Sequence, residues 1–392
     1  MAGMTTIMII AGESSGELYG ALLAKALMAR SPDLHIIGIG GERMKAAGVE
    51  LVSHISDAFG LVEAISSYRK IRASFNNAIE ALRKFRPDVL VPIDYPDFNM
   101  KVAQVAKTLG IKILYYVSPQ VWAWRRGRVK KIARLVDKMA VLLPFEEKIY
   151  KDAGVPCEFV GHPILQEIEA YLQAKDKREL KAALGLDTDK PILALLPGSR
   201  PHELNKLLPL MLDIARQLKD DPEIPQARKC QFCMPLAPNT EEKKYSHYLD
   251  QLKQEGVVIS KGDSVRVLAA SDIAVVASGT ATLQTAFLEV PMVVVYKLSP
   301  LTYHLGKLIV NVKHITLANI LSGREVVVEL LQEKANTGEV IREIKKVMFD
   351  TNYRDEMVRS YRKIKESFIG KNASERVAGM VMEMSGRPSV NK

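Results

Sequence analysis

Short apolar runs alternate with longer amphipathic stretches along most of the chain. The runs at 6–11, 89–93, 192–196, 273–277 and 292–296 contain no charged residue, and the stretches between them carry apolar residues at helical spacing. Strands without a polar face are typical of parallel sheets that are covered by helices on both sides. The pattern therefore predicts an α/β fold of doubly wound, Rossmann-like sheets.

The same alternation predicts the remaining elements and two domains. A chain of 392 residues is roughly two to three times as long as a typical domain. We expect further strands at 36–40, 113–117, 138–142, 157–160, 232–236 and 257–260, and helices at 18–30, 42–47, 100–109, 204–218, 280–288, 327–331, 339–349 and 353–383. The expected division is a first domain at 1–165, a connector at 166–190, a second domain at 191–349, and C-terminal helices at 350–392 that cross back to the first domain.

Residues 59–85 form one amphipathic stretch that combines apolar and basic side chains. These side chains include Leu61, Val62, Ile65, Arg69, Lys70 and Arg72. Proteins that lie on a membrane show such a surface to anionic lipid. A core helix with a solvated basic face has the same pattern, so exposure of the apolar members decides between the two interpretations.

The formal charge favours anionic partners. The chain has 55 basic and 45 acidic residues, a balance of +10, which suits phosphorylated metabolites, anionic lipid or nucleic acid. Only 6% of the residues are aromatic, and no basic run is interleaved with them as in proteins that bind single-stranded nucleic acid. We therefore expect no nucleic-acid partner.

Cysteine usage and hydropathy indicate the compartment. Cys157, Cys230 and Cys233 are too few for a disulfide framework, and the C-x-x-C that the last two form lacks a second ligand pair at zinc spacing. No metal site is therefore expected. The chain shows neither a signal peptide nor a run of the ~20 apolar residues that span a membrane, which predicts a cytosolic or peripheral protein.

Two turns that follow apolar strands are candidates for binding a phosphate. Gly279 lets the backbone approach a ligand, and Thr280 and Thr282 begin a helix whose N-terminus carries partial positive charge. The turn Gly198-Ser199-Arg200 follows another strand in the same half of the chain. Open α/β sheets bind ligands at the carboxyl ends of their strands, so the two turns can grip a diphosphate together. The structural alternative is an ordinary turn capped by Ser278 or Thr280.

Carboxylates and tryptophans mark two further loops. Asp94 and Asp97 follow a buried strand in a loop stiffened by proline, where a carboxylate can accept a proton, although either could instead cap the next helix. Trp124 and Arg125 stand in a basic run that suits an apolar ligand with an anionic head, or a packed helix start. His162 precedes a proline and is more typical of a structural hinge than of a base.

Nine motifs in this order and spacing resemble one enzyme family. AGESSGE, GIGGERM, PIDYPDFN, YYVSPQVWAWR, LPFEE, FVGHP, LPGSR, ASGTATLQ and NILSGREVVVELLQE run from about residue 7 to residue 332. Together they resemble lipid A disaccharide synthases, which are inverting glycosyltransferases of the GT-B fold, with two Rossmann-like domains that face a central cleft. The resemblance implies transfer of 2,3-diacylglucosamine from its UDP donor to the 6-hydroxyl of 2,3-diacylglucosamine 1-phosphate.

The resemblance also implies roles for residues of this chain. Asp97 would be the base, with Asp94 as second choice. The acceptor would be bound by Glu13, Ser14, Gly16, Trp124 and Arg125, and the donor by Gly198, Ser199, Arg200, Ser278, Gly279, Thr280, Ala281, Thr282, Gln284 and Asn319.

The implied substrates bear on cofactors and location. UDP is a stable anion that leaves without protonation, so one base is sufficient and no metal or other cofactor is expected. Acylated substrates place the enzyme on the cytoplasmic face of the inner membrane, which makes the apolar and basic stretch the favoured contact with anionic lipid. The oligomeric state stays open, with a homodimer as one option.

One position departs from the family pattern, and other functions compete. Gln284 stands where the family commonly has an acidic residue for the donor ribose, and a neutral amide makes weaker hydrogen bonds than a carboxylate. A UDP-sugar epimerase would share the fold and the nucleotide site. A lipid-binding module without turnover is a non-enzyme alternative. An NAD-dependent oxidoreductase fits less well because no loop has the G-x-G-x-x-G spacing.

Overall fold

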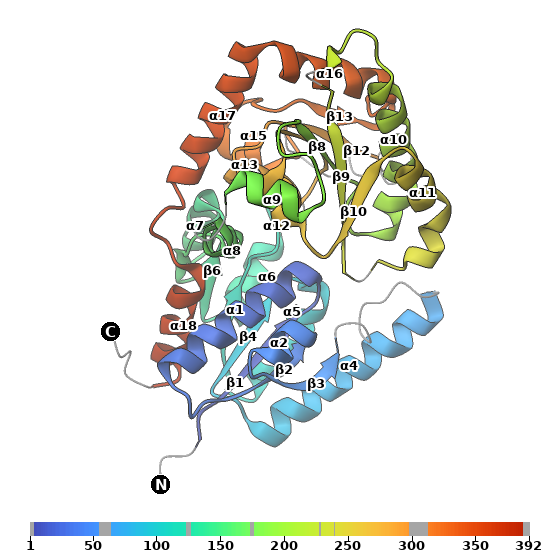
Figure 1. Ribbon diagram of the computed structural model, residues 1–392. Helices are drawn as coiled ribbons and strands as arrows, with labels where there is room; N and C mark the ends of the chain where they lie inside the picture. The colour runs from blue at the N-terminus through green and yellow to red at the C-terminus, as the bar shows by residue number, and fades with distance from the viewer. Residues whose placement is uncertain are drawn as a thin grey trace. The chain divides into compact units, whose positions relative to one another are not determined.

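The computed structural model describes residues 4–54, 64–122, 127–172, 176–226, 229–238, 240–297 and 313–386. The chain divides into two compact units, one formed by Met1–Pro163 with Gly370–Lys392 and the other by Ile164–Ile369. Figure 1 labels most of the elements of both units. The expected α/β fold class with doubly wound parallel sheets is confirmed in each unit.

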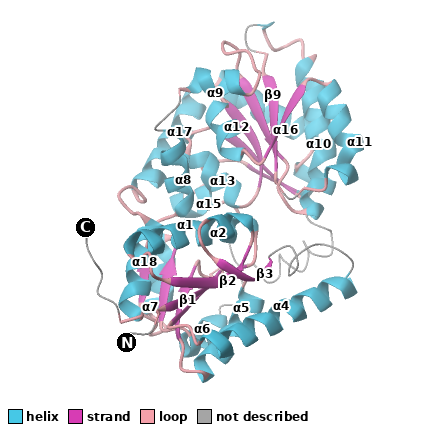
Figure 2. Cartoon of the chain, turned by 60° about the horizontal axis from the view of Figure 1, so that its bottom comes forward, coloured by secondary structure: helices cyan, strands magenta, loops and turns pink. Residues whose placement is uncertain are grey.

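Unit 1 is built on a parallel sheet with the strand order β3-β2-β1-β4-β5-β6-β7, as far as its residues are described. The strands are β1 (Thr6–Ala11), β2 (His35–Gly40), β3 (Glu50–His54), β4 (Val89–Ile93), β5 (Lys112–Tyr116), β6 (Lys138–Val141) and β7 (Cys157–Phe159). The helices, which cover both faces of the sheet (Figure 2), are α1 (Ser14–Arg30), α2 (Glu42–Ala46), α4 (Ala64–Phe85), α5 (Pro96–Thr108), α6 (Arg128–Leu135), α7 (Pro144–Lys151) and α18 (Ala373–Met384).

Unit 2 repeats this architecture with the strand order β10-β9-β8-β11-β12-β13 over its described part. The strands are β8 (Ile192–Leu196), β9 (Gln231–Leu236), β10 (Val257–Lys261), β11 (Ile273–Ala277), β12 (Met292–Tyr296) and β13 (Glu329–Leu331). The helices are α8 (Pro163–Leu172), α9 (Lys177–Ala183), α10 (Pro201–Lys219), α11 (Glu242–Gln254), α12 (Ser264–Ala270), α13 (Thr280–Phe287), α15 (Leu317–Ser322), α16 (Thr337–Phe349) and α17 (Thr351–Glu366), with the short 3₁₀ helix η2 (Gln332–Lys334).

The central strands supply the cores. Every residue of β1, β4, β8 and β11 is buried, and each fully buried aliphatic side chain contributes about 1.5–3 kcal/mol. β1 pairs with β4, and β8 pairs with β11. In both sheets the order of strands reverses between these central pairs, so the loops after them diverge. Open α/β sheets bind their ligands at such a switch point.

The structure differs from the sequence expectations in several elements. The expected helix at 327–331 is wrong: Glu329–Leu331 forms strand β13 beside β12, as its valine-rich approach favours. Strand β3 was not expected, because its residues are half-buried and carry polar side chains. The expected helix at 353–383 is two helices, α17 and α18, separated at Gly370, which has a φ of +73°.

The boundaries between the units also lie elsewhere than expected. The segment 166–190 contains α8 and α9, and Lys177 of α9 contacts Asp272 of unit 2 with Nζ to Oδ1 at 2.8 Å. It is therefore part of unit 2 and not a free connector. Of the C-terminal helices, only α18 belongs to unit 1, where Arg30 of α1 and Glu375 form an ion pair of 2.9 Å.

Candidate functional site

The loop after β4 has a strained backbone at the switch point of unit 1. Asp94 and Tyr95 both have positive φ, 47° and 41°, which costs a residue with a side chain about 1–3 kcal/mol. Three hydrogen bonds hold the turn: Asn99 Nδ2 donates to the carbonyls of Ile93 (3.2 Å) and Asp94 (2.7 Å), and Tyr115 Oη donates to that of Asp94 (2.7 Å). Strain of this kind is retained where it positions functional groups.

Tyr95 brings the loops after β1 and β4 together. A Cβ on Gly12 would lie 2.6 Å from Cβ and Cγ of Tyr95, so only glycine fits there. Burial raises the pKa of the Tyr95 phenol, and the carboxylates of Glu13 and Asp97 raise it further, because all three groups share this edge of the sheet. Tyr95 was not among the sequence candidates, because its contact with Gly12 joins two loops that are far apart in the sequence and meet only in the folded chain.

Asp97 lies in the first turn of α5, not in the loop that the sequence predicted. Its side chain is 72% exposed and pairs with Arg128 at the start of α6, with Oδ1 to Nη2 at 2.5 Å. Arg128 itself is only 23% exposed. A helix N-terminus and a guanidinium both stabilise a carboxylate, so Asp97 is an accessible acceptor of hydrogen bonds.

The other predicted acceptor residues are placed unequally. Glu13 is exposed and precedes α1, whereas Gly16 is buried in that helix with an ideal Cβ position 3.5 Å from Ile93. A Cβ at Gly16 would therefore make only an ordinary van der Waals contact with β4. The side chain of Ser14 and the residues Trp124 and Arg125 lie outside the described part of the chain.

A buried carboxyl organises the segment before α6. Glu146 accepts hydrogen bonds from Ser118 Oγ (2.6 Å), Trp122 Nε1 (3.1 Å) and the backbone N–H of Leu143 (3.1 Å). Burial raises the pKa of Glu146 to about 7 despite these bonds, which lower it. This residue of the LPFEE motif was missed as a functional candidate because its partners come from a different loop.

The turn after β11 offers unpaired donors at the switch point of unit 2. Gly279 has a φ of +148°, and its surroundings leave room for a ligand to approach. Among the described residues, no group accepts from the backbone N–H of Gly279, Thr280 or Ala281. Thr282 is fully buried, and its hydroxyl donates to the carbonyl of Gly279 at 2.8 Å, so it shapes the turn. The turn presents the donors that a phosphate requires.

The turn after β8 is only partly available to a ligand. The backbone N–H groups of Ser199 and Arg200 donate to Glu203 Oε2 at 2.9 and 3.0 Å. Gly198 has a φ of +95°, and a Cβ there would lie 2.2 Å from Oε2 of the same carboxylate. The exposed side chains of Ser199 and Arg200 are therefore what this turn can offer. The sequence analysis did not name Glu203, whose carboxylate comes from the first turn of the following helix α10.

Two predicted donor residues lie deeper in unit 2. Asn319 is fully buried, and its amide is saturated: Nδ2 donates to the Val327 carbonyl and to Glu329 Oε1, and Oδ1 accepts from the N–H groups of Val326 and Val327. The side chain of Asn319 thus has a structural role here, and its predicted contact with the donor stays a prediction. Gln284 is 7% exposed, and no described residue forms a hydrogen bond with its amide.

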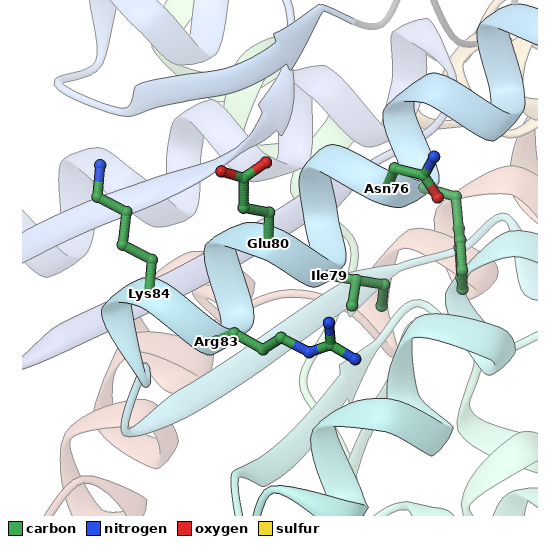
Figure 3. Close-up of a pocket in the computed structure, with 6 residues that line it drawn as sticks. Asn76, Ile79, Glu80, Arg83 and Lys84 are labelled. Atoms are coloured by element: carbon green, nitrogen blue, oxygen red, sulfur yellow. The ribbon is translucent and has the colours of Figure 1, made fainter.

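The basic stretch forms the start of α4 in unit 1. Arg69, Lys70 and Arg72 are exposed, whereas Leu61 and Val62, and the side chain of Ile65, lie outside the described residues. Farther along α4, a hollow is lined by Phe75, Asn76, Ile79, Glu80, Arg83 and Lys84. The side chains of Glu80 and Lys84 project from one side of the helix and that of Arg83 from the other (Figure 3). None of the helices in the described ranges is long and apolar enough to cross a membrane.

Two parallel, doubly wound α/β units with candidate loops at each switch point define the class of GT-B-type folds. A UDP-GlcNAc 2-epimerase from Neisseria meningitidis bound to UDP-GlcNAc matches with a TM-score of 0.68 and 12% identity, covering 97% of this chain and 100% of that one. A glycosyltransferase from Rickettsia africae matches with a TM-score of 0.57 and 13% identity, covering 97% and 99%. At this identity the likeness extends to the fold alone.

Sequence comparison gives the family. The family model described as lipid-A-disaccharide synthetase matches residues 7–381. The lipid-A-disaccharide synthase of Geobacter metallireducens is 42% identical over 383 residues, with 97% of both chains covered, and that of a Coxiella burnetii strain is 41% identical over 378 residues, with 96% and 97% covered. The chain belongs to the lipid-A-disaccharide synthetase family. It is an enzyme, a glycosyltransferase, and the epimerase alternative has only the resemblance of fold.

Proposed function

We propose that this enzyme transfers 2,3-diacylglucosamine from UDP to the 6-hydroxyl of 2,3-diacylglucosamine 1-phosphate. The bond from the anomeric carbon of the donor to UDP breaks, a bond from that carbon to the acceptor oxygen forms with inversion, and the hydroxyl proton passes to the enzyme. Family membership supports the reaction. The observation that carries it in the structure is the turn Gly279–Ala281, whose N–H groups have no acceptor among the described residues.

The leaving group is stabilised by positive potential. The N–H groups at the start of α13 would bind the diphosphate of UDP, and the exposed Arg200 would neutralise part of its charge. Because UDP is stable as an anion, no acid has to protonate it. Gln284, one turn into α13 and without a partner among the described residues, would hydrogen-bond the ribose hydroxyls.

The acceptor hydroxyl is activated by Asp97. Its exposed carboxylate, next to Glu13 and Tyr95, would remove the proton as the oxygen attacks, a contribution of typically 10²–10⁴-fold. Glu13 would hydrogen-bond the acceptor sugar. Asp94 is the less suitable base, because it lies in the strained turn that aims Asp97.

The substrates carry acyl chains, so the enzyme has to work at a membrane surface. We assign the membrane contact to the start of α4, where Arg69, Lys70 and Arg72 are exposed. Basic side chains near an anionic leaflet contribute about 1 kcal/mol each. The proposed location is the cytoplasmic face of the inner membrane, where UDP-sugars are available.

The test is turnover of UDP-2,3-diacylglucosamine with 2,3-diacylglucosamine 1-phosphate in a chelator, with UDP and disaccharide both quantified. We expect equal amounts of the two products, and no loss of rate on metal removal, because protein groups alone would stabilise the leaving UDP. Release of UDP without disaccharide would reject the proposed acceptor. Activity that returns only when a divalent metal is added would reject the metal-free mechanism.

A further inference from the structure

The ion pair between Asp97 and Arg128 joins two groups of opposite charge on neighbouring helices of unit 1. Asp97 is in the first turn of α5, and Arg128 is the first residue of α6. The carboxylate is 72% exposed and the guanidinium 23% exposed. The pair therefore has an accessible side, and the arginine is held by its surroundings more than the aspartate is.

The acceptor has matching groups at matching positions. Its nucleophile is the hydroxyl on carbon 6, attached to ring carbon 5, and its phosphate is on ring carbon 1. Carbons 1 and 5 flank the ring oxygen, so the neutral hydroxyl that must lose a proton and the phosphate anion are attached at the same end of the sugar ring. A pair of neighbouring groups, one basic and one cationic, matches this end of the acceptor.

We propose that Arg128 binds the 1-phosphate of the acceptor and so presents the 6-hydroxyl to Asp97. This inference rests on the proposed function for the identity of the acceptor. A guanidinium is a planar fork with five N–H donors, which matches the oxygens of a phosphate and can hold a carboxylate at the same time.

Exchange of partners gives the ion pair a second consequence. An ion pair with an exposed carboxylate is weak, because water screens it, and a phosphate with charge above one competes effectively for the same guanidinium. As the phosphate binds, Arg128 shares its charge with a second anion, and the Asp97 carboxylate becomes the stronger proton acceptor. The base is thus activated only when the correct, phosphorylated acceptor is in place.

The test compares acceptors with and without the phosphate. We would measure kcat/KM of the wild type, Arg128→Met and the control Lys130→Met for 2,3-diacylglucosamine 1-phosphate and for 2,3-diacylglucosamine. Lys130 is an exposed cation two residues farther along α6. Arg128→Met should lower kcat/KM for the phosphorylated acceptor roughly 10- to 100-fold, the value of charged hydrogen bonds, and should change that for the other acceptor less than about threefold. Lys130→Met should change neither.

Equal losses for both acceptors would overturn the proposal, because Arg128 would then only position Asp97. Equilibrium binding of each acceptor without donor repeats the comparison where the unphosphorylated compound is not turned over: an unchanged ratio of the two dissociation constants in Arg128→Met would also overturn it. If the methionine variant does not fold, Arg128→Lys is used, and its loss should again be confined to the phosphorylated acceptor. Failure of the wild type with the phosphorylated acceptor would instead reject the proposed function.

Discussion

At the scale of single residues, the turn at Asp94 and Tyr95 determines where the proposed base points. Two successive side-chain-bearing residues with positive φ are costly, and the hydrogen bonds from Asn99 and Tyr115 to the Asp94 carbonyl offset part of that cost. The result is that Asp97 begins α5 with its carboxylate exposed. The sequence indicated the carboxylate. The turn that leaves it exposed is held by Tyr115 of β5 and Asn99 of α5.

Asp97→Asn should reduce kcat by about 10²–10⁴-fold, because an amide keeps the shape of the carboxylate but cannot take a proton. UDP binding should remain, since the proposed nucleotide contacts are in unit 2. Turnover and isothermal titration with UDP would measure both effects. Asp152→Asn, at an exposed carboxylate at the end of α7, is the control. A kcat within threefold of the wild type would remove Asp97 as the base.

The buried carboxyl of Glu146 makes the stability of the folded protein depend on pH. Its pKa is about 7 in the folded protein against 4.5 for the free side chain, so the folded state binds the proton more tightly than the unfolded state does. This group therefore favours folding below pH 4.5, and its contribution is lost as the pH rises to about 7. Burial lowers the pKa of His162 to about 3. The unfolded state therefore binds this proton more tightly, and the folded state loses stability as the pH falls below 6.5.

Glu146→Gln removes the titration and isolates its effect. The difference in free energy of unfolding between the wild type and the variant should move by about 3 kcal/mol between pH 4.5 and pH 7.5, with the wild type losing stability relative to the variant as the pH rises. Denaturant unfolding at four pH values would measure the difference. Glu147→Gln, on the same helix and more exposed, should show a much smaller change; a pH-independent difference for Glu146→Gln would contradict the assignment.

At the scale of elements, the strands buried on both faces were predictable, whereas β3 and β13 were not. The bounds of β4, β8, β11 and β12 agree with the apolar runs, because a continuous apolar run has few alternatives in an α/β protein. β3 and β13 lie at the edges of their sheets. There the pattern is mixed, and pairing with the neighbouring strand decides the conformation.

The site shows the same limit. Arg200 and the Gly279 turn could be named from the sequence, since turns at strand ends are local features. The sequence did not reveal that Glu203 accepts hydrogen bonds from the N–H groups of its turn. It also did not reveal that the Asn319 amide is saturated by Glu329 and the backbone. Those facts depend on hydrogen-bond partners that only the folded backbone selects.

The β11–α13 turn can be tested through its glycine. Gly279→Ala should weaken UDP binding at least tenfold, because a φ of +148° is strained for alanine and relaxation would move the N–H donors. Gly256→Ala, at a φ of +85° after α11, carries a similar backbone cost away from this turn. Calorimetric titration with UDP and thermal unfolding should show that both variants are destabilised and only Gly279→Ala loses affinity. Normal UDP affinity in Gly279→Ala would contradict the assignment.

At the scale of the whole molecule, we propose that the excess of positive charge acts mainly through one basic surface on α4. A balance of +10 attracts any anion, but only a local concentration of basic residues selects a surface. Arg69, Lys70 and Arg72 stand within four positions at the start of α4 and are all exposed. Three basic residues of this kind contribute about 3 kcal/mol toward an anionic leaflet.

Reversing these three charges to glutamate should weaken binding to vesicles with anionic lipid by roughly 100-fold or more, and raised salt should weaken the wild type in the same direction. Sedimentation with vesicles would measure it. A matched triple change of Lys243, Lys244 and Lys253, exposed on α11, alters the net charge equally and should have a smaller effect. Equal effects would show that net charge alone drives the association.

The Glu203 carboxylate has a consequence for small molecules designed against this enzyme. It accepts from both backbone N–H groups of the turn after β8, so an inhibitor that extends a second acid toward Gly198 would meet a like charge and find these two N–H groups occupied. A compound with one anionic group for the Gly279 turn and a neutral or cationic group toward Glu203 would complement both turns. An analogue of UDP that keeps every phosphate charge would complement only the Gly279 turn.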